Sequence, residues 1–346
     1  MRIGMPLAYS GGFMETVAEL GEFERAGLDM VTVPEVYTFD AVSQLGYIAA
    51  RTERLTIASG ILQLYSRTPT LTAMTAAGLD YVSNGRFMLG IGASGPQVIE
   101  GFHGVPYDAP LGRTREIVEI CRMVWRRERV NYQGKHYQIP LPADKGTGLG
   151  KPLKLITTPV RERVPISIAA IGPKNVALTA EIAEGWQPIF FHPERASQVW
   201  GDALAEGKAK RDPSLGELEI IIPTAVAITE DVGTYVDMIR PQLALYIGGM
   251  GARGKNFYND LACRYGYEAE AKQIQDLYLD GKKQEATALV PEELVRATNL
   301  IGPESVVAER LAALKEAGVT TVNVTPLAPT HPERLALMTK LRELAG

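Results

Sequence analysis

Two segments of this 346-residue chain carry residues that can hold a flat ring and an anion side by side. The first, Ser59–Pro69, follows the apolar run Leu55–Ala58 and contains Gly60 within a strand-like sequence. Glycine in such a place marks a bulge or a close approach of the backbone to another group. The second, Gly90–Pro96, ends the next strand in a glycine–serine loop whose N–H groups can bind an anion. Together they predict a binding site for a cofactor that has both a ring and a phosphate.

A third segment, Ile168–Asn175, ends a strand and begins a helix. Within it Gly172 precedes Pro173, whose ring suits the first helical turn, and Lys174 follows with a positive charge. The free N–H groups of a helix N-terminus and a lysine both attract an anion. The alternative is an ordinary helix start with a solvated lysine, and the glycine–serine loop described above favours the anion site.

Residues with acid or base chemistry also follow predicted strands. Glu35 comes directly after a buried strand and can accept a hydrogen bond from a ligand ring. It can equally cap a helix or pair with an arginine, so both interpretations stay open. Tyr9, Tyr37 and Tyr65 lie at strand ends as well, and a tyrosine can donate a proton without titrating near pH 7.

Several other kinds of site lack their motifs. The four histidines and two cysteines show no spacing typical of metal ligands, so we expect no metal site. The Gly92–Gly95 loop lacks the Gly-x-Ser-x-Gly spacing of a hydrolase. A net charge of −4, a pI near 5.8 and an aromatic content of 7% argue against nucleic-acid binding.

Bulk composition favours a cytoplasmic protein. Two cysteines are too few for a disulfide framework and fit a reducing compartment. The first residues lack the apolar block of a signal peptide, and no apolar run approaches membrane-spanning length.

The elements that must position these residues alternate along the chain. Amphipathic helices repeatedly end in a glycine that is followed by a β-branched strand, as at Gly27, Gly85, Gly185 and Gly318. Strands are predicted near 2–8, 30–35, 55–64, 87–94, 165–170, 185–191, 218–229 and 320–327. Helices are predicted near 13–26, 41–51, 69–83, 112–128, 173–184, 193–209, 231–245 and 331–345. This alternation predicts an α/β fold, a TIM (β/α)8 barrel with insertions.

A doubly wound open sheet is the rival fold, but the first strand is not followed by a Gly-x-Gly-x-x-Gly turn. Residues 129–164 and 246–303 interrupt the alternation, the first with a hairpin-like sequence around Gly134. Insertions of this length are usually lids or binding loops. We therefore expect one decorated domain over residues 1–346.

Motifs spread over almost the whole length resemble those of one family. They are Ala26–Asp29, Ser59–Ile61 with Thr68–Pro69, Asp80–Arg86, Gly90–Gly92 and Glu184–Trp186. In this order and spacing the chain resembles the bacterial luciferase-like superfamily. Arg67–Pro69, Ala93–Gln97 and Gly172–Ala177 look most like its branch of oxidoreductases dependent on coenzyme F420, a deazaflavin.

The resemblance implies a cofactor site. It places a non-proline cis peptide at Gly60–Ile61, or one bond earlier, in a bulge that backs the ring. It assigns Glu35 to the polar edge of the ring. The other residues it assigns are Gly60, Ile61 and Leu62 at the bulge, Ala93, Ser94 and Gly95 beside the cofactor, and Gly172, Pro173, Lys174 and Asn175 on the phosphate side.

The resemblance also implies the reaction, a hydride transfer between coenzyme F420 and a small organic substrate. An FMN-dependent monooxygenase of the same superfamily is the alternative, and a phosphosugar isomerase or aldolase on the same barrel is a distant third. A homodimer is expected from the resemblance alone. The family's glucose-6-phosphate dehydrogenases carry a histidine where this chain has Val36, so we do not expect that activity.

Because that histidine is missing, another group must supply a proton to the substrate. The candidates at strand ends are Tyr65, Tyr37 and Glu35, with Tyr9 as a further tyrosine. Tyr65 is favoured because it is nearest in sequence to the bulge, although a tyrosine in this place can also be a wall of the pocket. If Tyr65 is the donor, Tyr65→Phe should lower turnover at least about a hundredfold.

Overall fold

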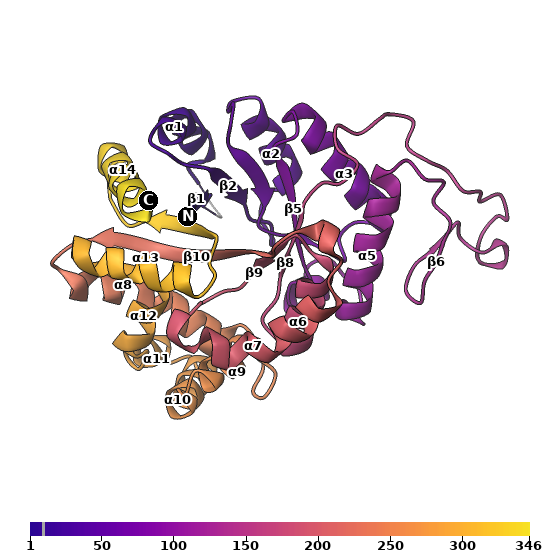
Figure 1. Cartoon of the computed structure of the whole chain (residues 1–346). Helices are drawn as coiled ribbons and strands as arrows, with labels where there is room; N and C mark the ends of the chain where they lie inside the picture. The colour runs from indigo at the N-terminus through magenta and orange to yellow at the C-terminus, as the bar shows by residue number, and fades with distance from the viewer. Residues whose placement is uncertain (9–10) are drawn as a thin grey trace.

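A closed barrel of eight parallel strands forms the centre of the molecule (Figure 1). The computed structural model describes residues 1–8 and 11–346. The barrel strands, in order, are β1 (Arg2–Pro6), β2 (Met30–Val33), β3 (Thr56–Ser59), β5 (Phe87–Gly92), β8 (Ile166–Ala169), β9 (Gly185–Gln187), β10 (Glu219–Ile228) and β12 (Thr321–Pro326). Pairing of β12 with β1 and of β9 with β10 closes the ring. The predicted (β/α)8 barrel is confirmed.

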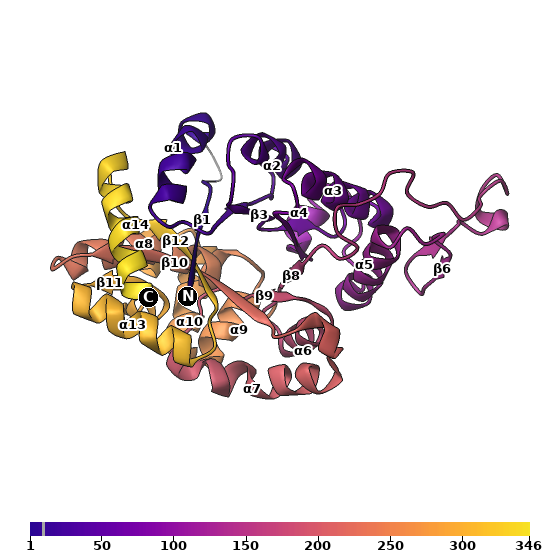
Figure 2. The same ribbon diagram turned by 45° about the horizontal axis from the view of Figure 1, so that its top comes forward.

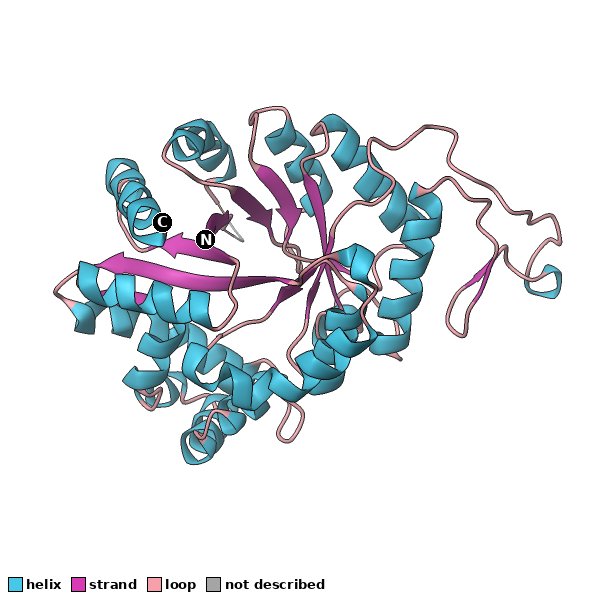
Figure 3. Ribbon diagram, viewed as in Figure 1, coloured by secondary structure: helices cyan, strands magenta, loops and turns pink. Residues whose placement is uncertain are grey.

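Helices surround the strands on the outside of the barrel (Figures 2 and 3). They are α1 (Phe13–Arg25), α2 (Ala41–Ala49), α3 (Pro69–Val82), α5 (Pro110–Trp125), α6 (Pro173–Ile182), α7 (Pro193–Lys210), α8 (Val232–Ala244), α13 (Glu304–Glu316) and α14 (His331–Ala345). The helix α13, which leads into β12, was not among the eight predicted ranges. Across residues 1–8 and 11–346, no helix combines the length and apolar character needed to span a membrane.

Local sequence explains where the helices near the site begin. The Thr68 hydroxyl accepts the N–H of Leu71 and Pro69 occupies the first turn of α3. Asp40 caps α2 in the same way through the N–H of Ser43. Both are standard N-terminal caps. They fix the ends of the loops that follow β2 and β3 at the mouth of the barrel.

Residues 129–164 extend away from the barrel beyond α5 (Figures 1 and 2). They contain an antiparallel hairpin, β6 (Tyr132–Gln133) with β7 (Gln138–Ile139), and a short 3-10 helix, Ala143–Lys145. Glu116 of α5 holds the hairpin turn, because its carboxylate accepts the backbone N–H groups of Lys135, His136 and Tyr137 at 2.8–3.2 Å. One buried carboxylate thereby attaches this segment to the body of the protein.

Residues 246–303 form a group of short helices next to α8 and α7 (Figure 1). The elements are a π-helix (Leu245–Gly249), α9 (Phe257–Arg264), α10 (Glu268–Leu279), α11 (Lys283–Ala288), α12 (Glu292–Thr298) and β11 (Leu300–Gly302). The last of these, β11, pairs in parallel with the end of β10.

The inside of the barrel contains few large side chains. Met30, Ala58, Met88 and Ile221 form a small buried cluster of their own, apart from the main core between strands and helices. Successive residues of a strand face opposite sides, so the residues that follow on this inner face toward the mouth are small ones such as Gly60 and Gly90. These small residues allow β3 and β5 to approach each other closely at this end of the barrel.

Candidate active site

The backbone bulges at the end of the third barrel strand. β3 ends at Ser59, the Gly60–Ile61 peptide bond is cis, and pairing with β5 resumes at β4 (Leu62–Gln63). The cis bond lies at the first of the two positions implied by the resemblance. Between the two paired stretches the Ser59 hydroxyl donates to the Gly90 carbonyl at 2.8 Å and accepts the Gly90 N–H at 2.9 Å. A side chain thus replaces the missing ladder hydrogen bonds.

Glycines opposite the bulge allow the backbone to come this close. A Cβ on Gly90 would lie 1.8 Å from the Ser59 carbonyl oxygen, closer than any carbon can approach. A Cβ on Gly92 would lie 3.1 Å from Cγ1 of Ile61. The two glycines therefore allow the backbone at the bulge to pack directly against β5 and the Ile61 side chain.

Glu35 forms a closely held ion pair inside the mouth. Its two carboxylate oxygens accept hydrogen bonds from the two terminal nitrogens of the Arg67 guanidinium group at 2.6 and 2.9 Å. One of these oxygens also accepts a hydrogen bond from the backbone N–H of Ala41 at 2.9 Å. Both side chains are largely buried, at 9% and 13% exposed. These hydrogen bonds engage both carboxylate oxygens of Glu35. The interpretation as a structural carboxylate therefore fits Glu35 better than the prediction that it donates a proton.

Tyr65 also has its hydroxyl group engaged. The hydroxyl donates to the backbone carbonyl of Asp108 at 2.8 Å, and the ring lies 5.2 Å from that of Tyr107. Burial, followed by the neighbouring Tyr107, raises the pKa of Tyr65 well above its usual value. Tyr65, the favoured proton donor, is therefore better described as a residue that lines the barrel mouth, because its hydroxyl already donates a hydrogen bond to the backbone.

Tyr37 is the third of the predicted proton donors. Its side chain is exposed and its ring lies 6.0 Å from Phe102. Within the part of the chain that the structure describes, its hydroxyl has no hydrogen-bond partner. Tyr9 lies outside the described residues. Tyr37 is thus the predicted tyrosine whose proton remains available.

The loop after β5 adopts a tight turn beside the bulge. Ser94 has a φ of 58°, a left-handed conformation that serine seldom adopts, and its carbonyl oxygen accepts the Tyr107 hydroxyl at 3.4 Å. Gly95 then precedes the four-residue helix α4 (Pro96–Ile99). Ala93, Ser94 and Gly95 follow Gly92 directly, so the structure brings them to the same side of the mouth as the bulge.

The loop after β8 begins α6 as predicted. Gly172 is the N-cap, and its carbonyl oxygen accepts the N–H groups of Asn175 and Val176 at 3.0 Å. Lys174 is exposed and makes no ion pair with any described residue, while the Oδ1 atom of Asn175 is buried without a partner. Because β5 and β8 are parallel neighbours, this loop and the Ser94 loop share one edge of the barrel. A free cation and the amide ends of a helix thus lie next to the bulge.

Comparison with known proteins shows the family to which the chain belongs. The family described as luciferase-like monooxygenase matches residues 1–321, which is almost the whole chain. This chain belongs to the luciferase-like monooxygenase family.

Relatives of the luciferase-like chain include proteins named for coenzyme F420. A candidate coenzyme F420-dependent oxidoreductase of Mycobacterium tuberculosis is 42% identical over 330 residues, covering 94% of this chain and 95% of the relative. The solved coenzyme F420-dependent tetrahydromethanopterin reductase of Methanopyrus kandleri superposes with a TM-score of 0.80 at 21% identity, covering 98% and 97% of the two chains. An F420-dependent secondary alcohol dehydrogenase, solved with an F420–acetone adduct, gives a TM-score of 0.76 at 18% identity over 100% and 99%. At these identities the two structures show the shared fold.

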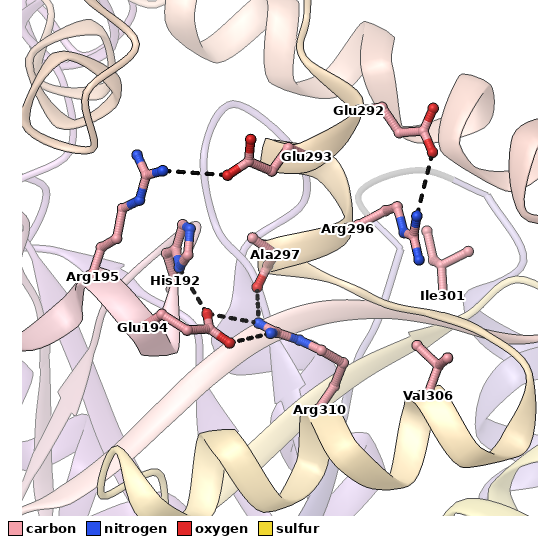
Figure 4. Close-up of a pocket in the computed structure, with 10 residues that line it drawn as sticks. All are labelled: His192, Glu194, Arg195, Glu292, Glu293, Arg296, Ala297, Ile301, Val306 and Arg310. Carbon is pink, nitrogen blue, oxygen red and sulfur yellow. Dashed lines mark hydrogen bonds and ion pairs between the residues drawn. The ribbon is translucent and has the colours of Figure 1, made fainter.

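A separate cavity of about 620 Å³ lies between α7, α12 and α13 of the luciferase-like barrel (Figure 4). Its charged walls are paired with each other: Arg195 with Glu293, Arg296 with Glu292, and Arg310 with Glu194. None of the predicted site residues lines it. This cavity is therefore separate from the predicted site at the bulge. No cluster of three or more potential metal ligands occurs among residues 1–8 and 11–346.

The contacts of Tyr65 change the expected effect of its mutation. Tyr65→Phe removes one hydrogen bond to a carbonyl group, so we expect a loss of about 1 kcal/mol in unfolding free energy and turnover within about threefold of wild type. Chemical denaturation and steady-state kinetics check both values. A hundredfold loss of turnover with unchanged stability would restore Tyr65 as the proton donor.

Proposed function

We propose that this luciferase-like protein is an oxidoreductase that transfers hydride between coenzyme F420 and a small organic substrate. The observation that carries the proposal is the bulge at Gly60–Ile61, faced by glycines and bordered by the Lys174 loop. The names of the 42% identical relative and of the two solved F420-dependent enzymes support the choice of cofactor.

The residues present fit the parts of this cofactor. Gly60, Ile61 and Leu62 would back the ring, and Gly90 and Gly92 allow the backbone behind them to pack closely. Ala93, Ser94 and Gly95 would lie beside it. On the phosphate side, Gly172, Pro173, Lys174 and Asn175 would offer a positive charge, helix N–H groups and the unpartnered Asn175 amide. When bound, the deazaflavin supplies hydride chemistry at its C5 carbon.

The protein's own acid–base contribution is assigned to Tyr37. Hydride transfer to a polarised double bond leaves negative charge that a positioned donor quenches, an effect of about 10²–10⁴ in rate. The Tyr37 hydroxyl is unengaged, whereas Glu35 and Tyr65 are bound to Arg67 and Asp108. Glu35 would then act by holding the loop after β2 in place.

We expect Tyr37→Phe to lower turnover about a hundredfold without weakening cofactor binding. Steady-state kinetics with the reduced cofactor, together with its dissociation constant, would measure both effects. Phe39→Leu, on the same exposed loop, is the matched control and should behave as wild type. If Tyr37→Phe also turns over as wild type, water or the substrate supplies the proton instead.

Lys174 is expected to bind the anionic tail of the cofactor. A charge-assisted contact contributes roughly 1.5–3 kcal/mol, so Lys174→Ala should weaken F420 binding about ten- to a hundredfold. Fluorescence titration at low salt measures the change. Lys151→Ala, which removes an exposed lysine of the projecting segment, should leave the affinity unchanged. Equal affinities for both variants would remove Lys174 from the site.

Turnover of the reduced cofactor tests the proposed reaction. Reduced F420 is incubated anaerobically with enones, imines and aldehydes, and formation of oxidised deazaflavin is followed. We expect oxidation that depends on both protein and substrate in the absence of oxygen. The alternative, an FMN-dependent monooxygenase, is favoured by the description of the family as monooxygenases. Oxidation that requires FMN and oxygen would establish that alternative.

Two further parts of the proposal concern the protein's surroundings. We propose a homodimer, which light scattering of the purified protein tests directly. A cytoplasmic location is proposed because both Cys121 and Cys263 are free thiols and burial raises the pKa of Cys121 to about 12, which keeps it unreactive.

A further inference from the structure

The loop after β9 holds an aromatic residue in an unusual backbone conformation. Phe190 has a φ of 50°, in the left-handed region that bulky side chains rarely occupy. Such a conformation is unfavourable and persists only where the surroundings enforce it. It clusters at functional sites, so it calls for an explanation at Phe190.

A buried tyrosine from the helical insertion enforces this conformation. The Tyr265 hydroxyl donates to the Phe190 carbonyl at 2.9 Å and accepts the His192 N–H at 3.2 Å. Tyr265 is 2% exposed, so these two hydrogen bonds are shielded from water and hold the loop in place. It fixes the half-buried Phe190 ring 5.3 Å from Tyr246 and 6.4 Å from Tyr258, and these two rings lie 4.7 Å apart. Phe190, Tyr246 and Tyr258 are called the aromatic wall below.

The aromatic wall follows the carboxyl end of β9, at the same end of the barrel as the bulge. Phe190 follows β9, whose last residue is Gln187. The Nε2 atom of Gln187 lies 2.9 Å from the position that a Cβ on Gly90 would take, and Gly90 is bound to Ser59 at the bulge. The Gln187 side chain at the end of β9 therefore lies close to β5, at the end of the barrel where the cofactor ring is proposed to lie. A substrate above that ring would meet the wall.

Other aromatic side chains lie on loops at the same end of the barrel. Tyr37 contacts Phe102, and Tyr65 contacts Tyr107, on loops that follow β2, β4 and β5. The charged side chains on these loops neutralise each other in ion pairs: Glu35 pairs with Arg67, and Asp108 pairs with Arg113. Moving a charged group of a substrate out of water next to them would be costly, because each cation already has its own carboxylate.

We infer that the substrate is a neutral molecule with an apolar, ring-sized body, and that the aromatic wall determines this specificity. The inference rests on the proposed function, since it concerns the substrate of that same site. Lys174, the free cation of the phosphate-side loop, is already assigned to the cofactor. Apolar contact with aromatic rings then provides the binding energy for the substrate.

Two aldehydes that differ in charge test the inference. They are 4-isopropylbenzaldehyde and 4-formylbenzoate, and their binding is measured by calorimetry, both to protein loaded with oxidised F420 and to apoprotein. Oxidised cofactor cannot reduce the aldehydes, so binding alone is observed. We expect the neutral aldehyde to bind at least tenfold more tightly. Phe190→Ala should remove most of this difference, and Phe190→Leu should retain part of it.

Phe257→Ala is the matched control, because it removes an exposed phenylalanine of the same insertion that lies outside the aromatic wall. It should bind both aldehydes as wild type does. Tighter or equal binding of 4-formylbenzoate, or no binding of either aldehyde, overturns the inference. So does an unchanged preference in Phe190→Ala. Failure of F420 itself to bind would contradict the proposed function instead, and the comparison on apoprotein would still decide the substrate class.

Discussion

Gly90→Ala is expected to destabilise the barrel severely and to abolish cofactor binding. The new Cβ would lie 1.8 Å from the Ser59 carbonyl oxygen and 2.9 Å from its carbon, and both belong to backbone that cannot swing away. Relief requires β3 and β5 to separate, which would break both hydrogen bonds between Ser59 and Gly90. Overpacking of this kind, with buried polar groups left unpaired, places the loss at about 4 kcal/mol or more. Chemical denaturation would measure it.

Gly78→Ala provides the matched control for this substitution. Gly78 lies within α3, is exposed, and has no atom within 4 Å of the position of an added Cβ. Alanine favours a helix over glycine by about 0.5–1 kcal/mol, so this variant should be slightly more stable than wild type. If Gly90→Ala were as stable as Gly78→Ala, the close approach of the backbone at the bulge would be wrong.

Glu35→Ala is expected to cost about 3–5 kcal/mol of unfolding free energy. The variant leaves the Arg67 guanidinium, 13% exposed, without the carboxylate that neutralises it. Removing one partner of a buried pair is strongly destabilising, because an uncompensated charge remains in a poorly solvated place. The loop after β2 should also loosen, so F420 binding should weaken with stability. Thermal and chemical unfolding, together with the cofactor titration, measure these effects.

The double variant Glu35→Ala/Arg67→Met separates a structural role from a direct one. Once both charges are removed, most of the stability should return, because the buried pair itself contributes little. If Glu35 only holds the loop, cofactor affinity should recover along with stability. Recovered stability without recovered affinity would show that Glu35 contacts the cofactor directly.

The barrel could be predicted because its signals are local. Each helix–glycine–strand repeat shows its type within about 20 residues, as at Gly85 before β5 and Gly318 before β12. The insertion at 246–303 also stood out as a break in the alternation. The helix α13 was missed from the predicted ranges because the helices of that insertion obscure where the regular alternation resumes.

The roles of individual site residues could not be predicted in the same way. The sequence indicates that Glu35 and Tyr65 lie at strand ends. It does not indicate that the Glu35 carboxylate pairs with Arg67, or that the Tyr65 hydroxyl donates to the Asp108 carbonyl. These partners lie 32 and 43 residues away, and only the closed barrel brings them together. The available signal in the sequence is that Arg67, within the Arg67–Pro69 motif, and Glu35 both follow predicted strands with opposite charges.

Two further features of the site depend on packing between distant strands. The sequence places Ser59 at the bulge. Its hydrogen bonds to the Gly90 backbone, however, depend on the contact between β3 and β5. The conformation of Phe190 depends on Tyr265, which lies 75 residues further along the chain in the insertion. No periodicity or short motif encodes such a pairing.

Titration of the apoprotein with coenzyme F420 and, separately, with FMN tests the central claim most directly. The account predicts saturable F420 binding in the micromolar range, weakened by Lys174→Ala and unaffected by Lys151→Ala, with FMN binding at least tenfold weaker. Micromolar binding of FMN without binding of F420 would contradict it.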